Sequence, residues 1–575
     1  MQRLSKLFTK TSKLSKEYDS KNATLLIKAG YIHQVMAGTY TLLPLGLRVY
    51  RKIEKVIREE MDKVSQELLM TSLSPMEPWE ITGRLDTVDI LMKTSGANEL
   101  SKKKNTSEYI LNCTHEDQIT PIAQKFNLSY KEFPFSVYQI QSKFRNEARP
   151  KSGIMRGREF IMKDAYSFHV SEEDLLEYYE VMKNSYMKIY ERLGLGDITL
   201  VALASGGDFT DKYSHEFQTI CETGEDLLFR DNKAGLVYNR EVTPAVAPQI
   251  DNKSEELKEM EEVEGKGIIG VEALAEYLKI PVEKTTKTIL FEDEKGEVIA
   301  AGVRGGRDID EGKLKKVAKV KELKLASEDT VKRVTGAQIG YAGILNLPKE
   351  VRIFMDESMQ GRSNFEMGAN KTDYHTININ FGRDLSEPEE FFDIKVAQPG
   401  DLNSETGEVY EVLRASEVGN IFPLNTKFSD AFGYKYTDQN GSKKSVYMGS
   451  YGIGLTRIMG VIAEIFNDEK GLVWPKEVAP FDIHFITLGE EHNDQAKVTI
   501  DLLENAGYDV LWDDRSEVSA GEKFGDAELI GIPIQIILSK RSLENGGLEI
   551  NFRKNKENNG IVEMENLIAK ITSLV

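Results

Sequence analysis

Residues 137–168 read VYQIQSKFRNEARPKSGIMRGREFIMKDAYSF, and this stretch decides the fold that we expect. Side chains alternate between the two faces of a β-strand. With that alternation, the residues that share the first face are polar or cationic: Gln139, Gln141, Lys143 and Arg145. Tyr138, Ile140 and Phe144 fall on the opposite face. The stretch therefore predicts a strand with one cationic face, then a loop and a second strand.

The loop and the second strand carry groups that suit a nucleoside triphosphate. Arg145 and Arg156 offer bidentate donors for phosphate oxygens, and Phe160 offers a ring that can lie on a base. Glu147 can accept a hydrogen bond from an exocyclic amine. The alternative is a surface hairpin whose charges form structural salt bridges.

A second informative segment is MGSYGIGLTRIMGVIAE, residues 448–464. Its pattern predicts a short strand, a turn containing Gly449, Gly452 and Gly454, and an apolar helix with Arg457 in its first turn. Glycines allow the backbone to approach a ligand closely, and an early-helix arginine can reach a phosphate or stack on a base. The segment lacks the GK[ST] of a P-loop and the GxGxxG spacing of dinucleotide sites, so neither mechanism applies.

A third segment, AGTYTLLPLGLRVYRKIEKVIREEM, spans residues 37–61 and places Pro44 and Gly46 before a predicted helix. The helix carries an apolar stripe at spacings of three and four, which continues past the segment: Tyr50, Ile53, Ile57, Met61 and Val64. Such a stripe indicates either a core face or a subunit interface.

Composition limits the class of protein. The chain has 575 residues, of which 40% are hydrophobic and 29% charged, enough for about three or four domains. The net charge of −19 argues against coating nucleic acid through bulk electrostatics, so any RNA site must be a local cationic patch. We expect no membrane segment, no signal peptide and no DNA partner. The basic start could imitate a transit peptide, but Cys113 and Cys221 are isolated, which fits a reducing cytoplasm.

The order of segments predicts a modular α+β chain. We expect the first catalytic part at 1–229, an α+β insert at 230–404, a second catalytic part at 405–475 and a C-terminal α/β domain at 476–575. Residues 252–266 are acidic and poor in apolar residues, which indicates a solvated helix or linker. A hairpin is expected at 286–303, around Gly296.

Taken in order, the three segments resemble the three signature motifs of class II aminoacyl-tRNA synthetases. The resemblance implies an antiparallel catalytic sheet, ATP and Mg²⁺ at the site, and a homodimer formed through the first motif; spacing does not identify the metal ligands. It implies that Arg145 holds the α-phosphate and the amino-acid carboxylate, Glu147 the adenine amine, and Arg156 the γ-phosphate. Phe160 and Arg457 would cover the two adenine faces, with Gly452 and Gly454 beside the nucleotide.

Further stretches resemble the bacterial prolyl members of that family, including CTHED, MKDAYSFH, SHEF and EVGNIF. That resemblance implies L-proline and tRNA(Pro) as partners, and the expected function is prolyl-tRNA formation through an adenylate. Thr114 and Glu116 would bind the imino group, and three further residues would line the pocket: His169, Glu216 and Ser450. From the residues alone, Thr114 and Glu116 could instead be a helix cap.

The insert resembles the editing domain of many bacterial prolyl enzymes, which implies hydrolysis of mischarged alanyl-tRNA(Pro). A proline pocket rejects the smaller alanine by only about 1–3 kcal/mol per missing methylene, so a second site is useful. Lys287, Asp356 and His375 fall at the family's deacylation positions, with Lys284 as a rival to Lys287. The family's threonine near the start of the insert is not evident in VEGKGIIG, which puts the efficiency of editing in question.

The C-terminal block resembles the class IIa anticodon-binding domain. Carboxylates can accept from guanine N1 and N2, and Lys or Arg can donate to O6 and N7. The expected readers are Asp514, Lys523, Asp526, Glu549 and Arg553. A charged residue on such a domain is otherwise simply solvated.

The sequence also allows three alternative functions to be compared with this one. A ligase of another specificity, such as a threonyl or glycyl enzyme, would keep the ATP motifs without this insert and THE at residues 114–116. A silent tRNA-binding paralogue would have lost Arg145, Glu147 or Arg457, and all three are present. The same residues disfavour a deacylase whose other half is only a scaffold.

Two departures from the prolyl pattern, ASGGDFTDKY at 204–213 and Asn420 in place of a common histidine, predict a retuned proline pocket.

Overall fold

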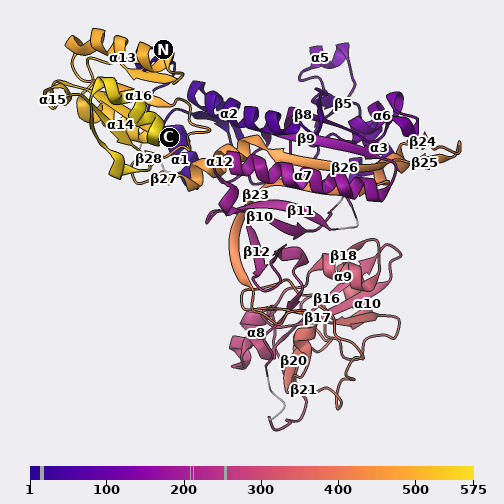
Figure 1. Ribbon diagram of the computed structural model, residues 1–575. Coiled ribbons are helices and arrows are strands. Elements are labelled where there is room, and N and C mark those ends of the chain that lie inside the picture. The colour runs from indigo at the N-terminus through magenta and orange to yellow at the C-terminus, as the bar shows by residue number, and fades with distance from the viewer. Residues whose placement is uncertain (13–17, 208, 211–212, 251–254, 575) are drawn as a thin grey trace. The chain divides into compact units, whose positions relative to one another are not determined.

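A computed structural model describes residues 1–12, 18–207, 209–210, 213–250 and 255–574 (Figure 1). The chain divides into two compact units. The first comprises Met1–Val201, Gly206–Glu225 and Arg414–Val575, and the second comprises Ala202–Ser205 and Asp226–Leu413. The second unit therefore begins and ends a few residues outside the limits of 230 and 404 that we expected for the insert.

An antiparallel sheet forms the centre of the first unit, as the sequence predicted. Its strands lie in the order β23 (Glu411–Asn425), β26 (Tyr447–Gly454), β9 (Glu159–His169) and β8 (Phe135–Phe144). β11 (Ser214–Ile220) pairs antiparallel with β23, and β4 (Gln66–Glu67) adds a parallel strand beside β8. Strands from distant parts of the chain are thereby held in one fixed register.

The β8–β9 hairpin follows the alternation seen in the sequence. Its register runs from Phe135 opposite Phe168 to Phe144 opposite Glu159. Gln139 lies opposite Asp164 and donates to its Oδ2 at 2.9 Å, so both side chains are on the same face. Tyr138 and Ala165 belong to the hydrophobic core on the other face. One face of the sheet is thus left for polar groups.

Helices cover the apolar face of this sheet. α7 (Glu172–Arg192) packs on β9 and β26, and α2 (Pro44–Met61) packs against α7 and α12 (Leu455–Ile465) (Figure 1). Pro44 stands at the start of α2, where its missing N–H is not needed. Tyr50, Ile53 and Ile57 of the predicted stripe are buried within the single chain, so the stripe is a core face.

The second unit contains two small sheets. A four-stranded sheet has the order β18 (Leu323–Leu325), β16 (Thr286–Asp293), β17 (Val298–Arg304) and β19 (Arg352–Met355), which confirms the predicted hairpin. A three-stranded sheet has the order β15 (Glu261–Glu264), β21 (Tyr374–Ile379) and β20 (Phe365–Gly368).

The acidic segment at 252–266 contains no helix where it is described. Residues 252–254 lie outside the described residues, and β15 pairs with β21 through Val263 opposite His375. Residues 255–260 are exposed and belong to no helix or strand, as the linker alternative predicted. Residues 261–264 instead form an edge strand, because backbone pairing overrides their polar composition.

The C-terminal domain is a six-stranded sheet covered by helices, as predicted. Its parallel centre contains β29 (Ile483–Thr487) between β30 (Val510–Asp513) and β31 (Ile534–Leu538), with β32 (Leu548–Phe552) and β33 (Gly560–Val562) beyond β31. α13 (Asn493–Asn505) and α14 (Ala520–Ile530) connect the parallel strands. The strand at the other edge was not expected, because it is β1 (Gln2–Arg3) from the chain's first residues.

Among the described residues, none of the helices is both long and apolar enough to cross a lipid bilayer.

Candidate active site

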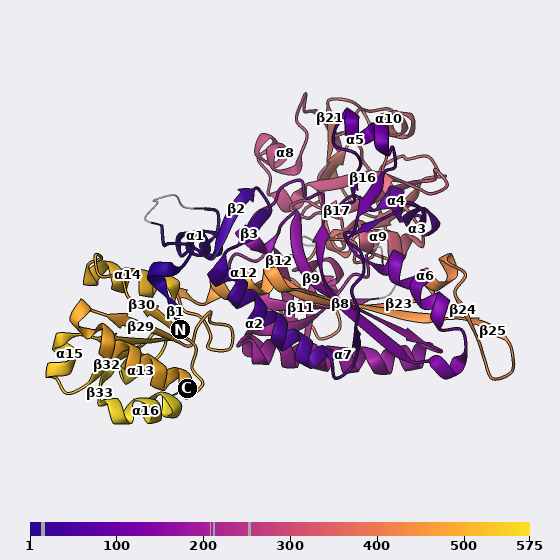
Figure 2. The ribbon, with the colours of Figure 1, turned by 90° about the horizontal axis from the view of Figure 1, so that it is seen from above.

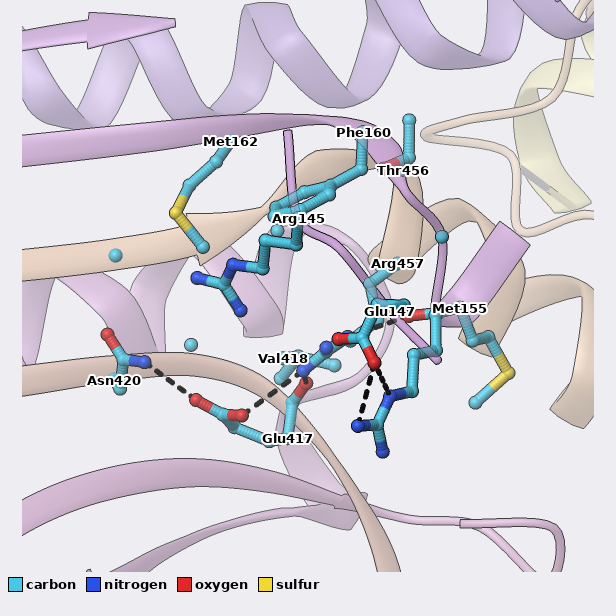
Figure 3. A pocket seen from close by; sticks show the side chains of 15 residues that line it. Arg145, Glu147, Met155, Phe160, Met162, Glu417, Val418, Asn420, Thr456 and Arg457 are labelled. Carbon is cyan, nitrogen blue, oxygen red and sulfur yellow. Dashed lines mark hydrogen bonds and ion pairs between the residues drawn. The ribbon is translucent and has the colours of Figure 1, made fainter. Parts of the chain in front are cut away.

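Three separate stretches of the first unit meet in one pocket on the polar face of the antiparallel sheet (Figure 3). They contribute residues after β8 and in β9, residues 417–420 of β23, and residues of β26 and α12. All seven residues predicted to bind ATP are among the 15 that line it: Arg145, Glu147, Arg156, Phe160, Gly452, Gly454 and Arg457. The register explains this meeting, because Gly452 lies opposite Asp164 on one side and Asn420 on the other.

Arg145 presents an unpaired donor to the pocket. Its backbone N–H donates to the Arg158 carbonyl at 2.9 Å, which continues the hairpin past the end of β8. The Arg145 guanidinium carbon lies 5.0 Å from the ring centroid of Phe160, within cation–π range. Its Nε is buried and has no hydrogen-bond partner among the described residues. Burial, with a contribution from the nearby Arg457 guanidinium, lowers the pKa of Arg145.

An unsatisfied buried donor is costly, which is why such groups are usually paired. An anionic ligand would satisfy the Arg145 Nε and relieve the repulsion between the two guanidinium groups. The pocket is therefore built to receive negative charge.

Glu147 and Arg156 are paired with each other in this structure. Both Nε and Nη2 of Arg156 lie 2.9 Å from Glu147 Oε2, and Arg156 Nη1 lies 2.6 Å from Glu225 Oε2. Arg156 is about 40% exposed, so these ion pairs are partly solvated and weak. A nucleotide that uses both residues has to exchange this pair for its own contacts.

Arg457 is fixed by residues that the sequence analysis did not place in the pocket. Its Nε donates to the Met155 carbonyl at 2.9 Å, and its Nη1 donates to the Glu417 carbonyl at 2.7 Å and lies 3.2 Å from Glu417 Oε2. Asn420 donates to the other oxygen of Glu417 at 2.7 Å (Figure 3). The sequence did contain a signal for Glu417. In EVGNIF, residues 417–422, Glu417 and Gly419 are two positions apart and therefore share one face of the strand, and Gly419 lines the pocket.

Gly452 is a residue of strand β26, not of a turn as predicted. A Cβ at this position would lie 2.8 Å from Oδ1 of Asn420, closer than real Cβ contacts allow. A side chain at this position would therefore require the Asn420 amide to move. The predicted turn was wrong because β26 continues to Gly454 and α12 begins at the next residue.

A second cluster surrounds the Glu116 carboxylate, at the start of α6 (Glu116–Phe126). Thr114 Oγ1 donates to Glu116 Oε2, and Ser450 Oγ donates to Glu116 Oε1 at 2.8 Å. Glu116 is only 1% exposed. The helix-cap interpretation is wrong, because His115 is the N-cap residue and no side chain makes a cap hydrogen bond there.

Buried charges flank Glu116 on both sides. Arg84 lies 2.5 Å from Asp117 Oδ2 and 3.6 Å from Glu116 Oε2. On the other side Lys143 lies 2.8 Å from Asp164. The three carboxylates and two cations leave one uncompensated negative charge, so the cluster suits a cationic ligand.

His115 is held between these groups in its neutral form. Lys143 Nζ donates to its Nδ1, and its Nε2 lies 3.0 Å from the Thr71 carbonyl. Burial, strengthened by the Lys143 charge, lowers the pKa of His115 to about 4. Its backbone N–H also donates to the Tyr166 hydroxyl at 3.1 Å. These contacts fix the segment that carries Thr114 and Glu116.

The other two predicted pocket residues lie on different faces of the sheet. Glu216 pairs with Asn420, which pairs with Gly452, so Glu216 belongs to the pocket face. His169 lies 5.5 Å, ring to ring, from Tyr178 of α7 and 3.0 Å from Asp174, which places it on the helix-covered face. The structure thus does not bring His169 to Glu116, because His169 is an odd number of residues from Asp164 along β9 and so faces the opposite side of the sheet.

In the second unit, the three predicted editing residues have separate partners. Lys287 forms an ion pair with Asp308. Both oxygens of Asp356 accept from backbone amides, of Ser358 and of Ile394, each at 2.9 Å. His375 Nδ1 lies 2.9 Å from Glu366 Oε1, and its Nε2 lies 3.1 Å from the Ile268 carbonyl.

Glu366 is a buried carboxylate that the sequence analysis missed. It is 1% exposed, and burial raises its pKa. Its Oε2 accepts from the Thr286 amide at 3.3 Å, which ties the His375 pair to the strand that carries Lys287. The rival Lys284 donates to Glu255 at 2.7 Å and to the Ser363 carbonyl at 2.9 Å.

Most predicted RNA readers of the C-terminal domain are occupied by the chain itself. Lys523 and Asp514 line a pocket at the ends of β29 and β30, but Lys523 is buried and donates to the Thr487 carbonyl at 2.6 Å. Asp526 accepts from Arg515 at 2.8 Å, and Glu549 of β32 accepts from Asn551 at 3.1 Å.

Arg553 lies elsewhere, against the β27 (Asn467–Asp468) hairpin. It is 3% exposed, 3.0 Å from Asp468 and 2.5 Å from Glu528. A guanidinium buried between two carboxylates cannot reach a base without breaking both ion pairs. The geometry therefore assigns Arg553 to the packing of the domain and not to its RNA surface.

Comparisons with known proteins agree with this arrangement. Residues 99–466 match the model of the tRNA synthetase class II core domain (G, H, P, S and T), and residues 482–574 match the anticodon binding domain. The chain is 39% identical to a proline–tRNA ligase of Listeria innocua, over 93% of both chains. It is 38% identical to one of Aquifex aeolicus, over 96% of both chains, and 38% identical to one of a Thermoanaerobacter species, over 100% of this chain and 99% of that one.

A solved structure shows the same fold at low sequence identity. The prolyl-tRNA synthetase of Cryptosporidium parvum, complexed with halofuginone and AMPPNP, aligns with a TM-score of 0.57 at 15% identity. The alignment covers 96% of this chain and 76% of that one.

Proposed function

The chain belongs to the proline–tRNA ligases of the class II tRNA synthetase family, and on that premise we propose that the pocket around Arg145 forms prolyl-adenylate from ATP and L-proline. The observation that carries the proposal is the buried Nε of Arg145 beside Phe160 and Arg457, which finds no hydrogen-bond partner in the described part of the chain. These groups offer donors for the α-phosphate and two flat surfaces for the adenine. Prolyl transfer to the terminal ribose of tRNA(Pro) would follow.

The cluster around Glu116 is the proposed proline subsite. Its one uncompensated negative charge matches the secondary ammonium of proline, and the Thr114 and Ser450 hydroxyls orient the carboxylate that would accept from it. Glu216 faces the same side of the sheet and would close the subsite at its far end.

The chemistry requires no nucleophilic side chain. The proline carboxylate attacks the α-phosphorus, pyrophosphate leaves, and Arg145 offsets the negative charge that develops. Positioning by the rigid sheet would supply much of the rate. Arg156 would leave Glu147 and follow the γ-phosphate, which frees the Glu147 carboxylate for the adenine amine.

Magnesium would enter with the nucleotide. No group of three or more His, Cys, Asp or Glu side chains in the described part of the chain forms a metal site on its own. Mg²⁺ commonly uses one or two carboxylates together with substrate phosphates, and Glu417 is the pocket carboxylate that fits this role. The ion would neutralise phosphate charge.

The test is exchange of labelled pyrophosphate into ATP by the purified protein. We expect exchange only when L-proline is present. Equal stimulation by threonine, or no stimulation by any amino acid, would rule the proposal out.

We also propose that the second unit hydrolyses alanyl-tRNA(Pro). Two observations support this proposal. Lys287 lies in β16, and the Thr286 amide of the same strand donates to Glu366 of the buried His375–Glu366 pair. Lys287→Ala should abolish hydrolysis of alanyl-tRNA(Pro) and leave pyrophosphate exchange unchanged. Lys284→Ala serves as the matched control, because Lys284 is held by Glu255; loss of hydrolysis only in that variant would transfer the role to Lys284.

A homodimer is proposed from family membership. Val35 and Met36, on the β2 (Ile32–Met36) and β3 (Thr39–Leu42) hairpin, are 63% and 54% exposed and offer an apolar surface for a second copy. Sedimentation of the wild type and of Val35→Asp tests this directly. A monomeric wild type would refute the dimer without touching the adenylation proposal.

A further inference from the structure

The first residues of the chain pair with the sheet of the C-terminal domain. β1 pairs in parallel with β30, through Gln2 opposite Leu511 and Arg3 opposite Trp512 (Figure 2). The Arg3 guanidinium lies 4.8 Å from the Trp512 ring centroid, and Leu4 is buried. The chain start is therefore an edge strand of the domain that matches the anticodon-binding model.

The segment that follows β1 covers two of the predicted RNA readers. Ser5 donates to Asp514 with its amide at 3.1 Å and with its hydroxyl at 2.8 Å. Thr11 donates to Asp526 at 2.6 Å. Because both carboxylates are about 10% exposed, a guanine edge could reach them only by displacing this segment. These three bonds instead hold residues 5–11 against the domain at both ends of the segment.

Between these two anchors the segment presents an aromatic ring and two cations to solvent. Phe8 is 84% exposed, which is the highest value for a large apolar side chain among the described residues. Lys6 and Lys10 are also exposed. A fully hydrated phenyl ring gains nothing from the fold of the single chain, so it points to a ligand or partner.

The chemistry of this surface fits a single-stranded loop of RNA. Unpaired bases stack on aromatic rings, and neighbouring lysines neutralise the phosphates between them. The chain carries a net charge of −19, so a cationic site for RNA has to be local, and these lysines flank the ring at two residues on either side. The surface is also continuous with residues 482–574, which match the anticodon binding domain.

We propose that residues 6–10 form an RNA contact of this protein, in which Phe8 stacks on an unpaired base of the anticodon loop while Lys6 and Lys10 contact the adjoining phosphates. The identity of the RNA as tRNA(Pro) rests on the proposed function. The contact itself rests on the anchored segment and its exposed residues.

The experiment measures the dissociation constant for tRNA(Pro) transcript and for its isolated anticodon stem-loop. Phe8→Ala should weaken both by roughly tenfold, because base stacking on an aromatic ring is lost, and Phe8→Trp should restore the affinity. The double variant Lys6→Ala/Lys10→Ala should reduce the slope of log affinity against log salt by about 1.4, or about 0.7 per phosphate contact.

Matched controls separate this contact from general effects. Leu502→Ala removes an exposed apolar side chain on α13, and Lys540→Ala removes an exposed charge beside the sheet; neither should change affinity. Proline-dependent pyrophosphate exchange needs no RNA and should be equal in all variants. Absence of exchange in the wild type would refute the ligase proposal, and the RNA affinities would still decide the contact.

Unchanged affinity in both Phe8→Ala and the double lysine variant would overturn the inference. It would equally be overturned if Phe8→Ala dissociated a dimer without weakening the stem-loop complex, because Phe8 would then be a subunit contact.

Discussion

The pocket around Arg145 and the C-terminal domain use buried charge in opposite ways. In the pocket, a buried donor of Arg145 has no hydrogen-bond partner among the residues that the structure describes, and the cluster at Glu116 keeps one negative charge uncompensated. In the C-terminal domain, Arg553 and Lys523 are buried and fully engaged by groups of the same chain. Charge left unsatisfied marks a ligand site, whereas charge that is paired internally marks scaffold.

The strongest way to break this comparison is to remove Arg145. Arg145→Ala should lower proline-dependent pyrophosphate exchange by about 10²–10³-fold, as expected when a donor to developing charge is lost. Arg145→Lys should lower the exchange rate nearly as much, because a lysine ammonium cannot make the bidentate contacts of a planar guanidinium. Exchange kinetics measure the effect, and Arg149→Ala, in the exposed loop, is the control. A loss below threefold in Arg145→Ala would contradict the assignment.

A substitution of Glu116 should raise the KM for proline. Glu116→Gln keeps the shape but removes the charge that pairs with the ammonium, so KM should rise by about 10- to 100-fold. The KM for ATP should stay the same, since the nucleotide groups are elsewhere in the pocket. Glu108→Gln, at an exposed ion pair with Lys93, is the control. An equal rise in both KM values would mean that the substitution disturbs the whole site.

Arg553 tests the other side of the comparison. Arg553→Met should leave two carboxylates, Asp468 and Glu528, without their partner and reduce the free energy of unfolding by about 3 kcal/mol. Urea unfolding measures this, and the exposed Lys554→Met is the control. Affinity for tRNA should persist in the folded variant. If Arg553→Met weakened tRNA binding without changing the free energy of unfolding, Arg553 would contact RNA after all.

The smallest expected effect concerns His484, a buried residue of β29 whose ring nitrogens lack partners among the described residues. Burial lowers its pKa to about 4, while Asp513, Asp526, Arg515 and Lys523 add opposing smaller effects. Between about pH 6.5 and 4 the unfolded chain binds a proton that the folded chain does not, so stability falls as pH falls.

His484→Leu removes this proton uptake. Relative to the wild type, the variant should gain about 1 kcal/mol at pH 5.5 beyond any difference seen at pH 8. Urea unfolding at the two pH values measures that change. Parallel pH profiles of the variant and the wild type would show that His484 does not titrate in this range.

How far the sequence predicted the site depended on the kind of residue. Arg145 and Phe160 line one pocket, as the sequence predicted, because strand alternation and hairpin pairing are local. Their roles in binding ATP stay predictions. His169 was misplaced because parity along β9 turns it towards α7. Glu417 and Glu366 were missed, because their roles depend on partners in other segments.

The sequence by itself determined the antiparallel hairpin, the helices that cover it, the α/β pattern of the last domain and the membership in a ligase family. Each follows from periodicity or from motifs within a few dozen residues. The tertiary structure alone decided which charges remain free. Ser5 and Asp514 are 509 positions apart, and Thr11 and Asp526 are 515 apart, yet these bonds cover two of the predicted readers and leave Phe8 in solvent. Ion pairs and hydrogen bonds act over a few ångströms, so their partners are fixed only when the chain is folded.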